Sequence, residues 1–393
     1  MDENIFKPRS GESWRNPYPM YANLRSNHPA YFVEDGSYWV FSRFQDVFNA
    51  ARNPEIFSSQ YGLTIEHNPS DLELGDATPI VFLDPPEHTQ FRRIISKGFT
   101  PRKANEMTQD IHSFVSDAID AIKEMESCDI IAELFKPLPS FVVSKYLGVP
   151  KSDRKNFDTW TEKIVAGAIH NGDAENTGLD AISELTNYFS EMISWRKKNP
   201  GDDLISQLLE IGEERVSIMW ILGLAFTMIT GGNDTTTGLL GGSAVLLTEN
   251  QKQKELLLKD LQLLPGAVEE LLRMTSPVQN LSRVLVQDFE LHGKRIPAGS
   301  RVLLSYASAN RDEREFGNNS ENLNIKRKIN QILSFGSGSH FCLGASIARL
   351  QSSIALKEIL INFPNFYVDE SSSEYAAGNY VRRHTYLPFH SSA

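Results

Sequence analysis

One of the chain's two cysteines, Cys342, lies in a glycine-rich loop at residues 335–344, FGSGSHFCLG. A thiolate there can bind a metal, while the glycines keep side chains away from a planar group that the metal carries. The helical pattern beginning at Ala345 brings the positive end of its dipole to the sulfur, which stabilises the anion. One thiolate is too few for a structural zinc site or an iron–sulfur cluster, but it suffices for haem, whose macrocycle fills four positions on the iron. The alternative is a buried core cysteine in a Gly/Ser turn, and the ten-residue context favours haem ligation.

This loop resembles the haem-binding signature of the cytochrome P-450 family, Phe-Gly-x-Gly-x-His-x-Cys-x-Gly, and every fixed position of that signature is present. The similarity continues from about Trp39 to the C-terminus. It implies haem b as the cofactor, with Cys342 as the axial ligand of the iron. It also implies a mainly α fold with small β-sheets, in which the haem is buried between a long central helix and the cysteine loop. The usual Pro and Phe of the family are missing at residues 321–325, which leaves the course of the chain there open.

A second motif, GGNDTT at residues 231–236, matches the family's oxygen-binding motif. An acid beside a hydroxyl, on a helix weakened by glycines, can hold the water that relays protons into a dry pocket. The resemblance therefore assigns proton delivery to Asp234 and Thr235. The alternative is a helix kink in which Thr hydroxyls bond back to carbonyls.

This motif lies in an apolar stretch that is long enough to cross a membrane. Between Arg215 and Glu249 the only charged residue is Asp234. The polar group at the middle of the stretch and its two glycine pairs favour a helix through the centre of a large helical protein.

Haem carries two propionates, which require cations or hydrogen-bond donors. Four residues match the propionate contacts of the resembling family, and for each taken alone a solvated surface role is the alternative: His88, Arg92, Arg283 and His340. Glu270 and Arg273, spaced i, i+3, match the family's Glu-x-x-Arg pair, which is structural and not catalytic.

Most of the remaining chain has helical patterns. One helix is predicted to begin at Thr100-Pro101, and another to run from Leu264-Pro265 to Ser276-Pro277. Strand-like alternation occurs at residues 30–43, 282–305 and 365–389. No repeat or flexible linker divides the sequence, so we expect one domain over residues 1–393.

Composition restricts the partners. The 393 residues carry a net charge of −11, which argues against nucleic acid as a general partner. Two cysteines far apart in sequence fit a reducing compartment, and the first residues resemble neither a signal peptide nor a membrane anchor. We expect a cytoplasmic monomer without a membrane anchor. The basic run at residues 326–328, joined by Arg102, Lys103 and Arg349, either docks an acidic ferredoxin or is a solvated charge run.

The resemblance implies a monooxygenase that takes O2 and two electrons from a separate ferredoxin and reductase and oxidises a lipophilic small molecule. The alternatives are a peroxide-driven or non-oxygenase haem-thiolate enzyme and a non-catalytic haem sensor or carrier. A steroid, terpenoid or fatty-acyl compound with a polar end for Gln279 or Asn280 is the expected substrate. By analogy the pocket is lined by the loop at residues 58–83 and by Thr227, Thr230, Gly231, Val278, Gln279, Asn280, Leu281, Tyr380 and Val381.

Overall fold

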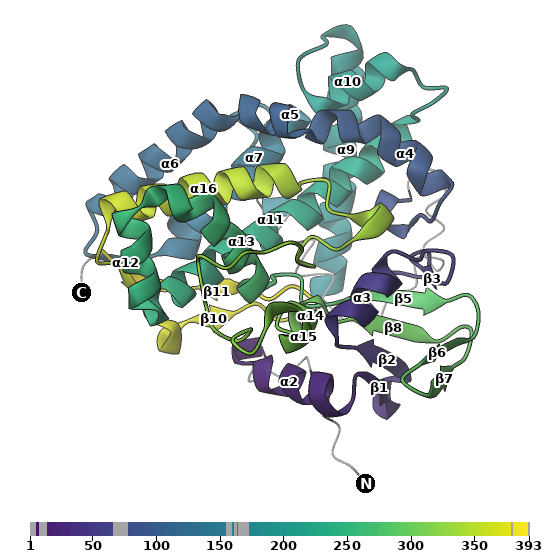
Figure 1. Ribbon diagram of the computed structural model, residues 1–393. Helices are drawn as coiled ribbons and strands as arrows, with labels where there is room; N and C mark the ends of the chain where they lie inside the picture. Colours follow the sequence, from purple (N-terminus) through teal and green to yellow (C-terminus); the bar gives the residue numbers. More distant parts are fainter. Residues whose placement is uncertain are drawn as a thin grey trace.

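A long apolar helix, α11, passes through the middle of a mainly helical molecule (Figure 1). The computed structural model describes residues 5–7, 14–65, 78–154, 159–160, 163, 173–378 and 380–391. Its helices are α2 (Tyr18–Asn27), α3 (Phe44–Ala51), α4 (Glu87–Ile95), α5 (Pro101–Glu106), α6 (Thr108–Lys123), α7 (Pro137–Leu147), α9 (Asp173–Lys198), α10 (Leu204–Ile211), α11 (Ile218–Glu249), α12 (Gln251–Lys259), α13 (Leu264–Thr275), α14 (Tyr306–Ala309), α15 (Glu313–Phe316) and α16 (Ala345–Asn362).

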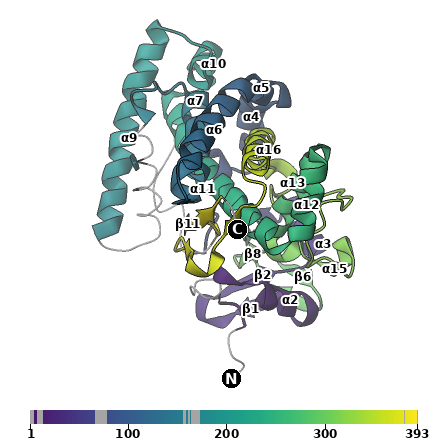
Figure 2. The ribbon, with the colours of Figure 1, turned by 90° about the vertical axis from the view of Figure 1, so that its left-hand side faces the viewer.

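Helix α11 is buried in protein, as the sequence predicts. It begins at the N-cap Ser217, whose hydroxyl accepts a hydrogen bond from the N–H of Trp220 at 3.1 Å. Its N-terminal half packs into one large apolar core and its C-terminal half into another, so the helix joins the two. Figure 2 shows α11 between α6, α7 and α9 on one side and α12 and α13 on the other. Among the described residues, no helix has the combination of length and hydropathy that crossing a bilayer requires.

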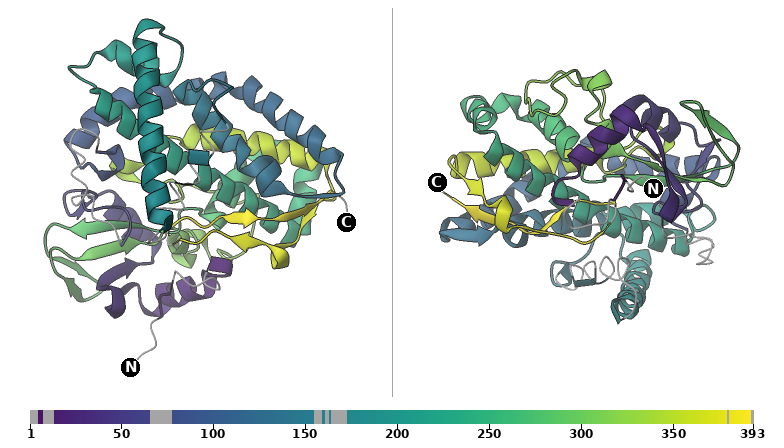
Figure 3. Two further views of the ribbon diagram at one scale, coloured as in Figure 1. Left: turned by 180° about the vertical axis from the view of Figure 1, so that it is seen from behind. Right: turned by 90° about the horizontal axis from the view of Figure 1, so that it is seen from below.

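The largest sheet lies at one end of the molecule and has the strand order β1-β2-β8-β5-β3. The strands β2 and β8 are parallel, and the other neighbours are antiparallel. In the view from behind, α9 runs in front of the other helices, and the C-terminal strands lie beside its lower end (Figure 3). The strands are β1 (Ala30–Val33), β2 (Tyr38–Phe41), β3 (Phe57–Ser58), β4 (Ser127–Asp129), β5 (Leu281–Leu285), β6 (Phe289–Leu291), β7 (Lys294–Ile296), β8 (Arg301–Leu304), β9 (Tyr367–Val368), β10 (Glu374–Tyr375), β11 (His384–Tyr386) and β12 (Pro388–His390).

The predicted helix starts and strand regions are confirmed. Thr100 caps α5 by accepting a hydrogen bond from the N–H of Lys103 at 3.3 Å, and Pro101 is the first helical residue. Helix α13 ends before Ser276, which has a φ of 38°. The strands β3 and β4, which sequence patterns did not reveal, have only two and three residues each, too few for a visible alternation.

Candidate functional site

The cysteine loop connects the short helical turn η8 (Gly338–His340) to α16. The N–H of Cys342 donates to the carbonyl of Phe335 at 2.9 Å, which closes the loop on itself. Gly338 has a φ of 73°, and a Cβ there would lie 2.8 Å from the carbonyl oxygen of Ala51. The backbone conformation and this close approach therefore account for that glycine. From the sequence alone, the loop glycines are explained by the space that a planar cofactor requires. The presence of glycine at position 338 is already explained by its backbone conformation and by the contact with Ala51.

Burial and the neighbouring groups have opposite effects on the pKa of the Cys342 thiol. Burial raises the pKa of the Cys342 thiol, whereas a hydrogen bond from the N–H of Gly344 and the charges of Arg92 and Arg349 lower it. Arg349 is fixed in place by Glu269, with which it makes hydrogen bonds of 2.5 and 2.9 Å. These contacts favour the thiolate, which is the form that binds a metal.

Four predicted residues form a basic cluster beside this loop: His88, Arg92, Arg283 and His340. The rings of His88 and His340 lie 4.2 Å apart between centroids. Arg92 donates to the carbonyl of Phe341, and Arg283 is buried on β5. Within the described ranges, neither arginine forms an ion pair with a carboxylate. The structure thus brings all four residues together.

The two histidines of the basic cluster are neutral. Burial and the charge of Arg92 lower the pKa of His88 to about 4, although Asp84 raises it. Burial lowers the pKa of His340 far below its usual range, and the charges of Arg283 and Arg92 add to this effect. Among the described residues, the buried Nδ1 of His88 has no hydrogen-bond partner. Buried polar atoms are rarely left in this state, so a bound group is expected to occupy this position.

The residues present fit haem. The basic cluster supplies two cations and neutral imidazole N–H groups for two carboxylates, and Cys342 supplies one sulfur ligand. Gly231 on α11 is exposed, and a Cβ added there would meet nothing within 4 Å, which marks open space beside the central helix. In the part of the chain that the structure describes, no group of three or more His, Cys, Asp or Glu side chains could hold a metal ion. A metal held by a macrocycle and one thiolate agrees with that finding.

An acidic residue that the sequence did not reveal fixes one wall of the basic cluster. Asp84 accepts hydrogen bonds from the hydroxyl of Ser58 at 2.5 Å and from the N–H of Ser59 at 2.9 Å. The hydroxyl of Ser59 lies 3.3 Å from Nε2 of His340. Asp84 therefore ties the start of the predicted pocket loop to the cysteine loop. Its place directly before two prolines, ahead of His88, was the only available signal.

The predicted proton-relay residues lie on α11, near the open space beside Gly231. The hydroxyl of Thr235 donates to the carbonyl of Gly231 at 2.9 Å, which is the back-bond of the alternative interpretation. Helix α11 nevertheless continues without interruption through this turn. The Thr235 oxygen can still accept a hydrogen bond. Asp234 forms an ion pair with Arg383, a residue that the sequence did not single out, with 2.8 Å between Oδ2 and Nε.

Most predicted pocket residues are only partly buried, as a pocket lining requires. Thr227, Thr230, Val278, Leu281, Tyr380 and Val381 belong to this group, and residues 66–77 of the pocket loop lie outside the described residues. Gln279 is a correction. Its side chain is completely buried, where it donates to the carbonyls of Thr275 and Ser276 and accepts from the hydroxyl of Tyr21. The polar atoms of Gln279 are thus used within the protein, and Asn280 is also buried and has an interaction within the protein.

The pair Glu270–Arg273 forms the centre of a buried network on α13. Both side chains are fully buried, with 2.7 Å between Glu270 Oε2 and Arg273 Nε. Glu270 Oε1 also accepts from the N–H of Asn324 at 3.0 Å and pairs with Arg327 at 3.1 Å. These bonds fix the segment around residues 321–325, where the family's usual Pro and Phe are missing.

Two members of the predicted docking cluster are therefore used inside the protein. Arg327 donates to the carbonyls of Phe316, Asn319 and Asn322 in addition to Glu270, and Arg349 forms an ion pair with Glu269. Lys103 pairs with Glu106 at 2.9 Å. Lys326, Lys328 and Arg102 remain exposed.

We expect Glu270→Ala to lower the free energy of unfolding by about 3–5 kcal/mol, because it leaves the buried cation of Arg273 without its partner. Urea unfolding monitored by circular dichroism measures this change. The control is Glu269→Ala, which removes a partly exposed ion pair and should cost at most about 1 kcal/mol. If the two variants lost the same free energy of unfolding, the buried pair would contribute no more to stability than the partly exposed one.

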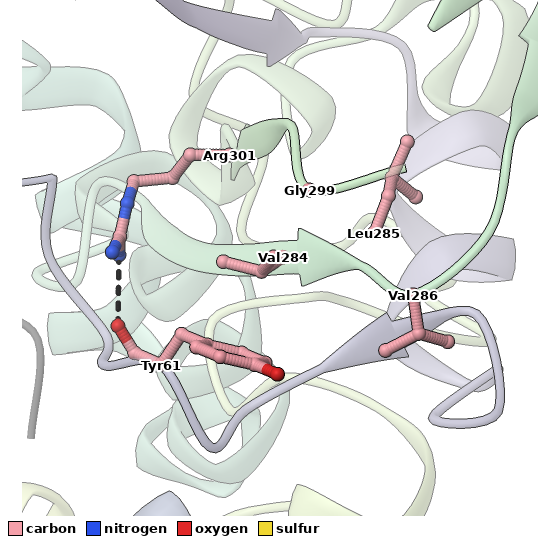
Figure 4. Close-up of a pocket in the computed structure, with 6 residues that line it drawn as sticks. All are labelled: Tyr61, Val284, Leu285, Val286, Gly299 and Arg301. Carbon is pink, nitrogen blue, oxygen red and sulfur yellow. Dashed lines mark hydrogen bonds between the residues drawn. The ribbon is translucent and has the colours of Figure 1, made fainter. Parts of the chain in front are cut away.

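A pocket of about 390 Å³ lies at the edge of the large sheet, away from the residues described above. Its lining consists of Tyr61, Val284, Leu285, Val286, Gly299 and Arg301 (Figure 4). Arg301 donates to the carbonyl of Tyr61 at 3.0 Å and so closes one side of it. Tyr61 belongs to the predicted pocket loop at residues 58–83, whereas the other five lining residues were not predicted as site residues.

Comparisons with known proteins agree with the sequence and the geometry. The family model for Cytochrome P450 matches residues 243–375. Cytochrome P450 130 of Mycobacterium tuberculosis (strain H37Rv) is 44% identical over 394 residues, which cover 98% of this chain and 97% of that protein. Vitamin D(3) 25-hydroxylase of Pseudonocardia autotrophica is 31% identical over 361 residues, 90% of this chain and 88% of that protein.

The fold is also similar to solved structures. The structure of CYP109E1 from Bacillus megaterium in complex with testosterone has a TM-score of 0.87 and 31% sequence identity, and the match covers 98% of this chain and 100% of that chain. This similarity confirms the predicted fold class, a mainly α protein with small sheets.

Proposed function

Because the chain belongs to the cytochrome P450 family, we propose that it is a monooxygenase acting on a neutral lipophilic small molecule. Members of this family bind haem b and are oxidoreductases. The proposed reaction consumes O2, two protons and two electrons, and the electrons come from a separate ferredoxin and its reductase. One oxygen atom is inserted into the substrate, and the other leaves as water. The observation that carries the proposal is the pairing of Asp234 and Thr235 on a helix that faces open space, in the same molecule as Cys342 and its basic cluster.

Haem bound at Cys342 supplies the reductive activation of dioxygen, which charge donation from a thiolate favours. The basic cluster holds the two carboxylates of the cofactor: Arg92 and Arg283 provide charge, and the neutral rings of His88 and His340 provide N–H donors. Arg349 and the N–H of Gly344 stabilise the anionic form of the Cys342 sulfur and so partly offset the rise in its pKa that burial causes. These residues bind and orient the cofactor and do not themselves transfer protons.

Proton delivery is the proposed task of Asp234 and Thr235. The Thr235 hydroxyl proton is directed at the carbonyl of Gly231, so its oxygen is free to accept from a water in the open space. Asp234 is the residue directly before Thr235, and its ion pair with Arg383 is made through Oδ2. A carboxylate and a hydroxyl in this order can reload and orient such a water.

The pocket residues favour a neutral substrate. Thr227 donates to the carbonyl of Gly223 at 2.8 Å and Thr230 to that of Phe226 at 3.0 Å, so both present only acceptor oxygens. The other proposed lining residues, Val278, Leu281, Tyr380 and Val381, carry no charge at neutral pH. A largely apolar compound with a hydroxyl group matches this lining better than a free carboxylate does. The named relatives, a vitamin D(3) 25-hydroxylase and a testosterone complex, support a steroid-like substrate ahead of a terpenoid or fatty-acyl one.

The test combines binding and turnover. The haem spectrum is recorded with a panel of neutral steroids, terpenoids and fatty acids, because a ligand that displaces water from the iron shifts it. We expect neutral steroids such as testosterone to give the largest shift. With a surrogate ferredoxin, reductase and NADPH, the same compounds should yield a product one oxygen atom heavier.

Two outcomes of this test would replace the proposal. Product formed only with added hydrogen peroxide would indicate a peroxide-driven enzyme. Ligand binding without turnover under either condition would indicate a sensor or carrier.

A further inference from the structure

The C-terminal segment at residues 380–384 lies against the middle of α11. A Cβ added at Gly238 would lie 2.6 Å from the carbonyl oxygen of Arg382, so helix and segment approach at backbone distance. The segment is also fixed to the residues after α13. Gln279 donates its N–H to the carbonyl of Tyr380 at 2.7 Å, and Arg382 donates its N–H to that of Pro277 at 2.8 Å. Its position relative to α11 is therefore set by backbone contacts on two sides.

Successive side chains of this segment serve different partners. Arg382 donates to the carbonyl of Trp14 at 2.5 Å and to the hydroxyl of Tyr375 at 2.6 Å, and so binds the N-terminal region. Arg383 has its Nε 2.8 Å from Asp234 Oδ2. The side chains of this pair are 15% and 18% exposed, so solvent screens it less than a surface pair.

We propose that Arg383 is the positioning residue of the proton-delivery acid: it fixes one carboxylate oxygen of Asp234 and leaves the other to exchange protons with water. This inference rests on the proposed function and adds a residue to it. The segment that carries Arg383 also supplies Tyr380 and Val381 to the proposed pocket. One segment of the chain thus carries both the residue that orients Asp234 and two residues that a substrate would contact.

Tyr380 lies within the electrostatic range of the same pair. Burial raises the pKa of the Tyr380 hydroxyl, the charge of Asp234 raises it further, and Arg383 lowers it. Tyr380 in the proposed pocket wall therefore interacts electrostatically with both members of the Asp234–Arg383 ion pair. A positioning role is favoured over a purely structural one because the backbone contacts of Gln279 and Arg382 already hold the segment in place without the Arg383 side chain.

The test compares Arg383→Gln with Arg383→Lys in the haem-loaded protein, with surrogate ferredoxin, reductase and NADPH. The substrate is the steroid of the panel that the parent oxygenates fastest. Arg383→Gln should lower the rate of product formation about ten- to a hundred-fold, because a displaced catalytic group costs this much. Arg383→Lys should recover most of the loss. The double variant Arg383→Gln/Asp234→Asn should be no slower than Asp234→Asn alone.

A matched control and a second readout make the outcome decisive. Arg295→Gln removes the same kind of side chain from an exposed ion pair with Asp288 and should leave the rate unchanged. Thermal unfolding of the two single variants and the double variant should give non-additive shifts in the melting midpoint, which requires no turnover. Additive shifts, or a parent-like rate in Arg383→Gln, would overturn the inference. A parent that oxygenates no compound would overturn the proposed function instead, and the unfolding cycle would still decide whether the pair couples.

Discussion

Thr235→Ala is expected to keep consuming NADPH while it releases hydrogen peroxide in place of oxygenated product. The substitution removes the hydroxyl oxygen that is free to accept from a water beside α11, since its proton is directed at the carbonyl of Gly231. Electron input and oxygen binding do not depend on this group. Asp234→Asn should slow the whole cycle, by about 10²–10⁴-fold, because the carboxylate can no longer carry a proton.

The measurement is product formed per NADPH oxidised, with hydrogen peroxide assayed in parallel. Thr236→Ala is the matched control, since its buried hydroxyl lies 3.4 Å from Nε2 of Gln351 on α16. That variant should keep the coupling of the parent. Full coupling in Thr235→Ala would mean that its hydroxyl serves only the helix, as in the back-bonding alternative, and would require another proton path.

The sequence predicts many helix ends and strand regions correctly because the signals for these features lie in a few neighbouring residues. The N-cap and first proline of α5, the end of α13 at Ser276 and the strand-like alternation of β1 and β2 each follow from a few adjacent residues. The long apolar stretch with a polar group around Asp234 at its middle likewise predicts a central helix. Short strands such as β3 and β4 escape this reasoning, because partners distant in the sequence define them.

Side-chain partners were the harder part of the site. Gln279 was expected to hold a substrate, yet its carboxamide bonds to the backbone carbonyls of Thr275 and Ser276 at the end of α13. Arg327 was expected on a docking surface, yet it points inward to Glu270. Arg383 was not singled out, although it pairs with Asp234 across about 150 residues. A sequence shows that a polar residue is present, but only the fold shows which polar atom it meets.

Cys342→Ser is expected to abolish thiolate ligation of the haem, because a serine hydroxyl stays protonated and is a poor substitute for a thiolate ligand. The other cysteine cannot take this role. Cys128 lies on β4, paired with Phe389, and burial together with Glu133 and Asp129 raises the pKa of its thiol to about 11. Burial also raises the pKa of the Cys342 thiol, but here Arg92, Arg349 and the N–H of Gly344 lower it and partly offset that rise. The two cysteines thus differ in the sign of the charge around them.

The most direct test of the central claim is the absorption spectrum of the reduced carbon-monoxide complex. The parent and Cys128→Ser should show the red-shifted band that thiolate ligation produces, and Cys342→Ser should lack it. Retention of the band in Cys342→Ser, or its loss in Cys128→Ser alone, would contradict the assignment of Cys342 as the axial ligand and with it the proposed site.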